Sequence, residues 1–377
     1  MRKVEVGDKM RNQDIQYDIM HGNQKVAELN RNGTCHVYDE NMMPYNLYLE
    51  QPDNEDIDIR LQNLDNFYHW CASRMLTLDR EYAKEILNSI NVSQSATDKD
   101  RAQVALSYHC LSLMDVYWVK ESEEQVDFSQ LNLFENHLSS AFVDVSLRGK
   151  QMTIDNSHLI AEDLSTQGCF PKAWVRREDG FYLLKDGGID AVESELLASK
   201  ICRCFSVSQV KYEEEWYDGQ KVSVSRILTS LDHSIVPVEY FDVYCHNQEI
   251  DRMEYILKLD GYSYYMMNII DYLVGNTDRH WSNWGLLVDN ETNKPLRLYD
   301  LMDFNRAFQS YDTLEGAGCL TTAGKMSQRQ AAQEAVLRIG LPQTSGIKAE
   351  WFAEESIREM FFQRLEVLQT LIDKSTV

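Results

Sequence analysis

The chain has 377 residues, of which 44% are hydrophobic and 26% charged, a composition that excludes a disordered or collagen-like protein. Its formal net charge of −23 argues against direct nucleic-acid binding as the main activity, because an acidic surface repels phosphate backbones. Eight cysteines without a C-x-x-C pair predict reduced thiols in a cytoplasmic protein and give no zinc pattern. No signal-peptide pattern opens the sequence, and no run of about 18 apolar residues predicts a membrane span.

Residues 1–155 are predicted to form an N-terminal accessory region, mixed and largely helical. Short apolar runs predict strands at 25–29, 34–38 and 45–50. Apolar residues at helical spacing predict two helices, at 64–90 and 101–119, the second capped by Thr97 and Asp98.

Residues 156–245 have the pattern of a small sheet with one inserted helix. Asp-Gly pairs between two β-rich runs predict hairpins at Asp179-Gly180 and Asp218-Gly219. The segment between the two hairpins predicts a helix over 192–205.

Residues 246–377 are mainly helical. The predicted helices are 264–274, 328–339 and 351–372. Between the first two, residues 284–304 predict a strand, a polar turn and a second strand. The fold class expected for the whole chain is therefore α+β, with an accessory region, a β-rich lobe and a helical lobe that carries a hairpin.

The polar loop before this hairpin carries the residues of greatest chemical interest. Antiparallel pairing of the two strands is expected to place Asn283 beside Asp300, with Asp278 in the adjoining loop. Mg²⁺ prefers such oxygen ligands, and phosphoryl transfer also needs a separate carboxylate that faces the acceptor hydroxyl. Asn283 and Asp300 fit the metal and Asp278 fits the hydroxyl; the spacing from Asp278 to Asn283 is that of the kinase D-x-x-x-x-N loop.

These motifs resemble a known family. The stretch G-N-x-D-R-H-x-x-N-x-G from Gly275, followed by a strand ending in Y-D, resembles the catalytic core of HipA-like serine/threonine kinases. Its D-R-H-x-x-N loop is also similar to that of phosphatidylinositol 3/4-kinases. Upstream, S-T-Q-G-C-F-P-K at 165–172 resembles the phosphate loop of the HipA-like family. The strand end Y-L-L-K and the helix S-E-L-L-A-S-K resemble its lysine and glutamate elements.

The resemblance implies a bilobal protein-kinase-like fold that uses ATP and Mg²⁺, and it implies roles for individual residues. The resemblance assigns nucleotide binding to Gly168, Lys172, Lys185 and Glu195. It assigns catalysis to Asp278, with His280 as the less favoured proton acceptor. It assigns metal binding to Asn283 and Asp300. Ser165 and Thr166 are candidate autophosphorylation sites. Two choices stay open, Asp303 in place of Asp300 and Glu193 in place of Glu195.

The function expected from this resemblance is transfer of the γ-phosphoryl group of ATP to Ser or Thr of a protein substrate. The resemblance further implies a toxin-type or regulatory kinase that autophosphorylates, with an antitoxin-like partner protein. The alternatives are a lipid or small-molecule kinase and a catalytically silent ATP-binding partner protein. The sequence departs from eukaryotic kinases in having Y-D-L-M-D-F in place of D-F-G and no A-P-E.

Overall fold

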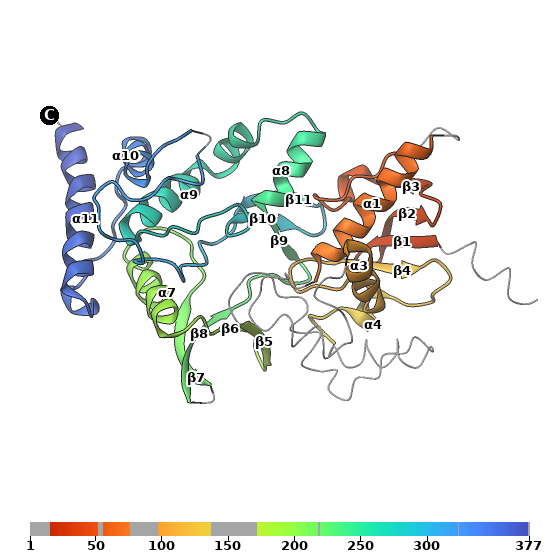
Figure 1. Ribbon diagram of the computed structural model, residues 1–377, viewed down its shortest axis with the longest axis horizontal. Coiled ribbons are helices and arrows are strands. Elements are labelled where there is room, and N and C mark those ends of the chain that lie inside the picture. The colour runs from red at the N-terminus through yellow and green to blue at the C-terminus, as the bar shows by residue number, and fades with distance from the viewer. Residues whose placement is uncertain are drawn as a thin grey trace, which may run out of the picture. The chain divides into compact units, whose positions relative to one another are not determined.

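Figure 1 shows a computed structural model of the chain. It describes residues 16–51, 56–75, 97–136, 172–217, 219–322 and 324–375. Packing divides the chain into two units. The first holds the N-terminal residues up to 169 together with 229–234 and 290–293, and the second holds the rest. Within the described ranges, no helix has both the length and the apolarity needed to cross a membrane.

The first unit is built on a four-stranded sheet in the order β3-β2-β1-β4, in which neighbouring strands run antiparallel. Its strands are β1 (Gln16–His21), β2 (Gln24–Asn30), β3 (Cys35–Val37) and β4 (Tyr117–Glu121). Its helices are η1 (Glu40–Met42), α1 (Ile57–Ser73), α3 (Asp98–Ser107) and α4 (Phe128–Leu131). Phe67, Trp70 and Trp118 are buried among the largest core side chains of the unit.

The strands that the sequence predicts at 25–29 and 34–38 are confirmed as β2 and β3, whereas β1 and β4 were not predicted. The helix expected over 101–119 ends at Ser107, and residues 117–121 form strand β4, which pairs with β1. Positive φ angles at His109 (59°) and Cys110 (54°) turn the chain out of the helix. The predicted cap is confirmed at Thr97, the N-cap of α3, but its partner in the capping box is Asp100 and not Asp98, which is the first residue of the helix. Residues 45–50 form no strand, and residues 76–90 of the first predicted helix lie outside the described residues.

The second unit begins with a four-stranded antiparallel sheet in the order β5-β6-β8-β7. Its strands are β5 (Lys172–Arg177), β6 (Gly180–Lys185), β7 (Tyr212–Tyr217) and β8 (Gln220–Arg226). Both hairpins are confirmed, and Gly180 and Gly219 adopt the positive φ angles that such turns favour. Helix α7 (Ile189–Cys202) joins β6 to β7, where the sequence predicts a helix.

The helical part of the second unit also contains a three-stranded sheet in the order β11-β10-β9. Its strands are β9 (His233–Pro237), β10 (Gly285–Asp289) and β11 (Lys294–Leu298). Its helices are α8 (Val238–Asn247), α9 (Arg252–Val274), α10 (Gln328–Ile339), η2 (Ala349–Trp351) and α11 (Glu355–Ser375). Helices α10 and α11 pack on α9 (Figure 1). The predicted helix 264–274 is the second half of α9, after a kink at Asp260. The carboxylate of Asp260 accepts hydrogen bonds from the amides of Ser263 and Leu298, which ties the kink to β11.

Candidate active site

A buried ionic cluster forms where β6, α7 and the segment after β11 meet. Lys185, the last residue of β6, places its Nζ 2.8 Å from Oε1 of Glu195 and 3.1 Å from Oδ1 of Asp303. Lys185 is 7% exposed and Glu195 is 1% exposed. The second carboxylate oxygen of Glu195 accepts a hydrogen bond from Ser223 on β8. The hydroxyl oxygen of Tyr212 on β7 accepts a hydrogen bond from the amide of Asp303.

The charges of this cluster stabilise one another. Burial lowers the pKa of Lys185, but Asp303 and Glu195 outweigh it and hold that pKa well above its usual value. Burial raises the pKa of Asp303, but Lys185 and Lys172 outweigh it and lower that pKa to about 2. The ammonium and the Asp303 carboxylate are therefore both charged at neutral pH.

The geometry distinguishes Glu195 from Glu193. Glu193 points its carboxylate to Lys221, 2.6 Å away, and its side chain is 54% exposed. Glu195 is buried and contacts Lys185 directly. Of the two glutamates that the sequence leaves open, Glu195 is the one beside the strand lysine.

The loop that carries Asp278 starts where α9 ends. Gly275 closes α9 in the left-handed conformation (φ 61°, ψ 42°), the usual glycine cap of a helix C-terminus. A Cβ at this position would overlap the ring of Tyr311, so the loop leaves the helix through a space that admits only glycine.

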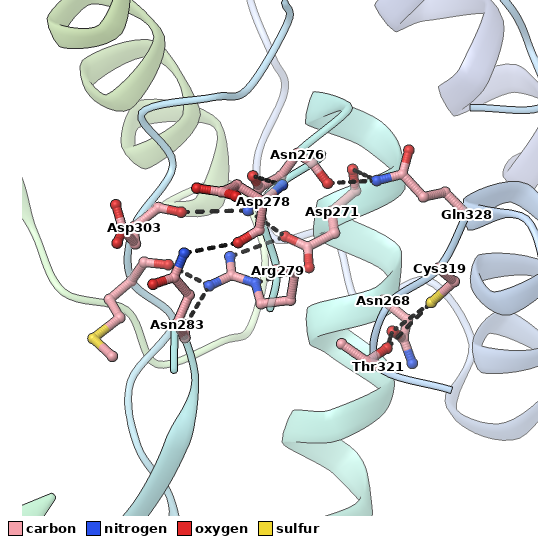
Figure 2. A network of polar contacts seen from close by, with 11 residues as sticks. Asn268, Asp271, Asn276, Asp278, Arg279, Asn283, Asp303, Cys319, Thr321 and Gln328 are labelled. Atoms are coloured by element: carbon pink, nitrogen blue, oxygen red, sulfur yellow. Dashed lines mark hydrogen bonds and ion pairs between the residues drawn. The ribbon is translucent and has the colours of Figure 1, made fainter. Parts of the chain in front are cut away.

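Arg279 fixes this loop from within. Its guanidinium forms two ionic hydrogen bonds to Asp271 on α9, at 2.9 and 3.0 Å, and both side chains are buried. Asp271 raises the pKa of Arg279 although burial opposes it. Asn276 donates to Asp271 at 3.2 Å, and Gln328 on α10 donates to the carbonyl of Asn276 at 2.6 Å. Arg279 therefore braces the loop, as Figure 2 shows.

The same arginine joins the loop to the Asp303 segment. Nη1 of Arg279 donates to the carbonyl of Asn283 at 2.7 Å and also to the carbonyl of Met302. Nδ2 of Asn283 donates to the carbonyl of Asp278 at 2.7 Å. Asn276 Nδ2 donates to the carbonyl of Asp303 at 3.3 Å. Asp278, Asn283 and Asp303 thus belong to one network (Figure 2).

Asp300, the residue that the sequence favours as metal ligand, makes no contact with Lys185 among those the structure records and pairs with Arg297 instead. Its Oδ1 accepts a hydrogen bond of 2.6 Å from Arg297, three residues earlier on β11. The structure brings Asp303, and not Asp300, to Lys185 and Glu195. A positive φ of 61° at Asp303 turns the chain there, and the Asp303 side chain faces Lys185.

The remaining expected site residues are placed as follows. Lys172 pairs directly with Lys185 across β5 and β6. Two lysines opposite each other in an antiparallel ladder repel unless anions lie nearby, and Glu195 and Asp303 are such anions. His280 is exposed, and its Nδ1 accepts a hydrogen bond from the amide of Ser282. Ser165, Thr166 and Gly168 lie outside the described residues.

Sequence reasoning missed several residues of the site. Asp271, Asn276 and Gln328 are buried and hold the loop. Arg306, three residues after Asp303, places its Nε 3.6 Å from Oδ2 of Asp278. The sequence could have indicated Asp271, because Asp271 and Asn268 interrupt a stretch of α9 that otherwise holds apolar and aromatic residues. No comparable signal in the sequence marks Arg306.

The donors present suit a magnesium ion that is held jointly with phosphates. Among the described residues, no group of three or more His, Cys, Asp or Glu side chains could hold a metal ion alone. Mg²⁺ usually takes only one or two protein ligands and completes its octahedron with phosphate and water. The ionised Asp303 carboxylate and the Asn283 side-chain oxygen are hard ligands of this kind.

Comparison with known proteins yields distant structural likenesses. No protein-family model and no curated protein matches the chain. The proinflammatory kinase CtkA of Helicobacter pylori is 15% identical, with a TM-score of 0.45 over 55% of this chain and 93% of that one. HipA of Shewanella oneidensis MR-1, solved in a toxin–antitoxin complex with HipB and operator DNA, is 12% identical, with a TM-score of 0.47 over 94% of this chain and 90% of that one. At these identities and TM-scores, neither likeness assigns a family or a function to this chain.

Proposed function

We propose that the protein is an ATP- and Mg²⁺-dependent kinase that phosphorylates Ser or Thr of a protein substrate. The observation that carries the proposal is the buried cluster of Lys185, Glu195 and Asp303, joined through Arg279 to the loop of Asp278 and Asn283. A lysine–glutamate pair, a metal-binding acid, a loop acid and a loop asparagine are the groups that protein kinases use for phosphoryl transfer.

In this proposal the cluster binds the nucleotide. Lys185 contacts the α- and β-phosphates, and Glu195 holds the direction of its ammonium group. Lys172, opposite Lys185 in the ladder, adds positive charge at the same place. Asn283 and Asp303 hold Mg²⁺, which neutralises phosphate charge and orients the γ-phosphoryl group.

Asp278 faces the acceptor. Its side chain is 27% exposed, so an incoming hydroxyl has access to it. It orients this hydroxyl and takes its proton as the phosphoryl group is transferred. Arg279 and Asn283 keep the Asp278 backbone in place, which preserves the orientation between turnovers.

The wider proposal follows from the sequence resemblance. The second unit would contain the two kinase lobes, one built on β5–β8 and α7 and the other on α8–α11. Autophosphorylation at Ser165 or Thr166, a regulatory or toxin-type role and an antitoxin-like partner protein remain predictions. The net charge of −23 favours a protein acceptor over an anionic lipid surface.

The direct test is incubation of the protein with radiolabelled ATP and Mg²⁺, with protein and phosphatidylinositol acceptors in separate reactions. We expect wild-type protein to label itself or a protein acceptor, and Asp278→Asn to lose labelling while it still binds ATP. His280→Ala tests the less favoured proton acceptor in the same loop. We expect this variant to keep most of the transfer, because the His280 side chain is exposed and accepts a hydrogen bond from the amide of Ser282. Labelling of lipid alone would favour a lipid kinase, and binding of ATP without any transfer would favour a silent ATP-binding protein.

A further inference from the structure

The segment between α10 and α11, residues 341–351, contacts the chain just after α7, and we call it the strap. The amide of Thr344 donates to the carbonyl of Cys204 at 2.7 Å. The amide of Ser206 donates to the carbonyl of Pro342 at 2.9 Å. The residues between these two bonds, one on each side, form an isolated antiparallel β bridge. The strap is therefore hydrogen-bonded to the residues that directly follow α7.

Two side-chain contacts extend this attachment. Nζ of Lys200, in the last turn of α7, lies 4.6 Å from the centre of the Trp351 ring. A distance of this size is typical of a cation–π contact. Cys204 is buried, and its Sγ lies 3.8 Å from the carbonyl oxygen of Gly346. The strap thus holds both the last turn of α7 and the residues beyond it.

The same helix carries the buried glutamate of the candidate site. Glu195 lies five residues before Lys200, a distance of about 7.5 Å along the helix axis. Because i→i−4 hydrogen bonds join these residues into one helix, a shift of its C-terminal end carries Glu195 with it. The contact of Glu195 with Lys185, at 2.8 Å, depends on the position of α7.

We propose that the strap positions α7 for nucleotide binding, and that Trp351 and Thr344 are positioning residues that act through Glu195. This inference rests on the proposed kinase function. The strap holds the C-terminal end of α7 and so keeps Glu195 against Lys185, whose ammonium is then directed at the phosphates of ATP. In protein kinases the corresponding lysine–glutamate pair must be in place, and the position of the glutamate helix controls this. Here the strap supplies that control from the segment that follows α10.

A structural alternative is that the strap only adds stability to the second unit. The two roles differ when the Glu195 carboxylate is removed. A segment that acts through Glu195 then loses its influence on ATP binding. A segment that only stabilises the unit lowers binding to the same extent whether or not the carboxylate is present. A double-mutant cycle measures this difference.

The experiment measures by calorimetry the affinity of the full-length protein for Mg·ATP, with and without Glu195→Gln. The strap is loosened by Trp351→Ala together with Thr344→Pro, since proline lacks the amide hydrogen that bonds to Cys204. We expect this pair of replacements to lower the affinity at least about fivefold in wild type, but less than about twofold beside Glu195→Gln. Hydrogen exchange of the α7 amides should become faster, whereas exchange of the α9 amides should stay as in wild type.

The matched control is Lys348→Ala. Lys348 belongs to the strap, but its side chain is 64% exposed and lies 3.9 Å from the carboxylate of Glu350, a weak surface pair. This variant should keep wild-type affinity and exchange. An equal or greater loss beside Glu195→Gln, no loss in wild type, or unchanged exchange of α7 would overturn the inference while the kinase proposal stands. Failure of wild type to bind Mg·ATP would instead refute the kinase proposal, and the inference with it.

Discussion

Replacement of Glu195 by glutamine removes one charge from the buried cluster without changing the shape of the side chain. Removal of one partner of a buried ion pair typically costs about 3–5 kcal/mol, because the other charge is left without compensation. Here Asp303 remains 3.1 Å from Nζ of Lys185, so the lysine keeps one counter-charge. We therefore expect Glu195→Gln to lower the free energy of unfolding by a smaller amount, about 2–3 kcal/mol.

Native-state hydrogen exchange of the α7 amides measures this loss locally, without a contribution from the first unit. Glu193→Gln is the control, since it neutralises a glutamate two residues away that pairs with Lys221 at the surface. Exposed pairs contribute about 0–1 kcal/mol, so the control should change exchange little. Equal losses in the two variants, or no loss in Glu195→Gln, would refute the view that the cluster is a buried, interdependent ion group.

Three further outcomes are expected. Gly275→Ala should destabilise the second unit by more than about 1 kcal/mol in thermal melts, because alanine disfavours the left-handed conformation and its Cβ meets Tyr311. The control is Gly261→Ala, which should not destabilise the unit, because a Cβ there meets its nearest atoms at 3.9 Å. The pKa of Asp303 is lowered from 3.8 to about 2, so its charge contributes about 2 kcal/mol of stability above pH 3.8, and this is lost as pH falls toward 2. In EDTA, the stability difference between wild type and Asp303→Asn should therefore shrink over that range, and a constant difference would contradict the linkage. In kinetic assays, Arg279→Lys should lower the rate of phosphate transfer far more than the affinity for ATP, because lysine cannot reproduce the two hydrogen bonds to Asp271. An unchanged rate would show that the Arg279–Asp271 pair is not needed to position the loop.

Local signals in the sequence predicted the parts of the fold that depend on neighbouring residues. The Asp179-Gly180 turn fixes β5 against β6, and apolar spacing predicts α10, whose Ser327 cap the structure adds. Strand β4 was missed because its partner, β1, lies about a hundred residues earlier in the chain. Helical spacing over 101–119 could not reveal a strand that such distant pairing stabilises.

The candidate site shows the same limit. Residue types and spacing alone were enough to propose the loop of Asp278 and Asn283 as part of the site. Two other features of the site depend on packing that residue spacing does not encode. Asp300 and Asp303 follow the same strand, and only the Arg297 contact and the turn at Asp303 separate them. Arg306 meets Asp278 through the path of the chain after Asp303, which the sequence pattern does not specify.

Magnesium-dependent ATP binding by Asp303→Asn and Asp300→Asn, measured by titration calorimetry beside wild type, tests the account most directly. If the nucleotide is bound at Lys185, Glu195 and Asp303, Asp303→Asn should lose at least about tenfold in affinity for ATP in the presence of Mg²⁺. Asp300→Asn should stay within about twofold of wild type, since Asp300 contacts Arg297 and not Lys185. Unchanged binding by Asp303→Asn, or a larger loss in Asp300→Asn, would contradict the proposed site.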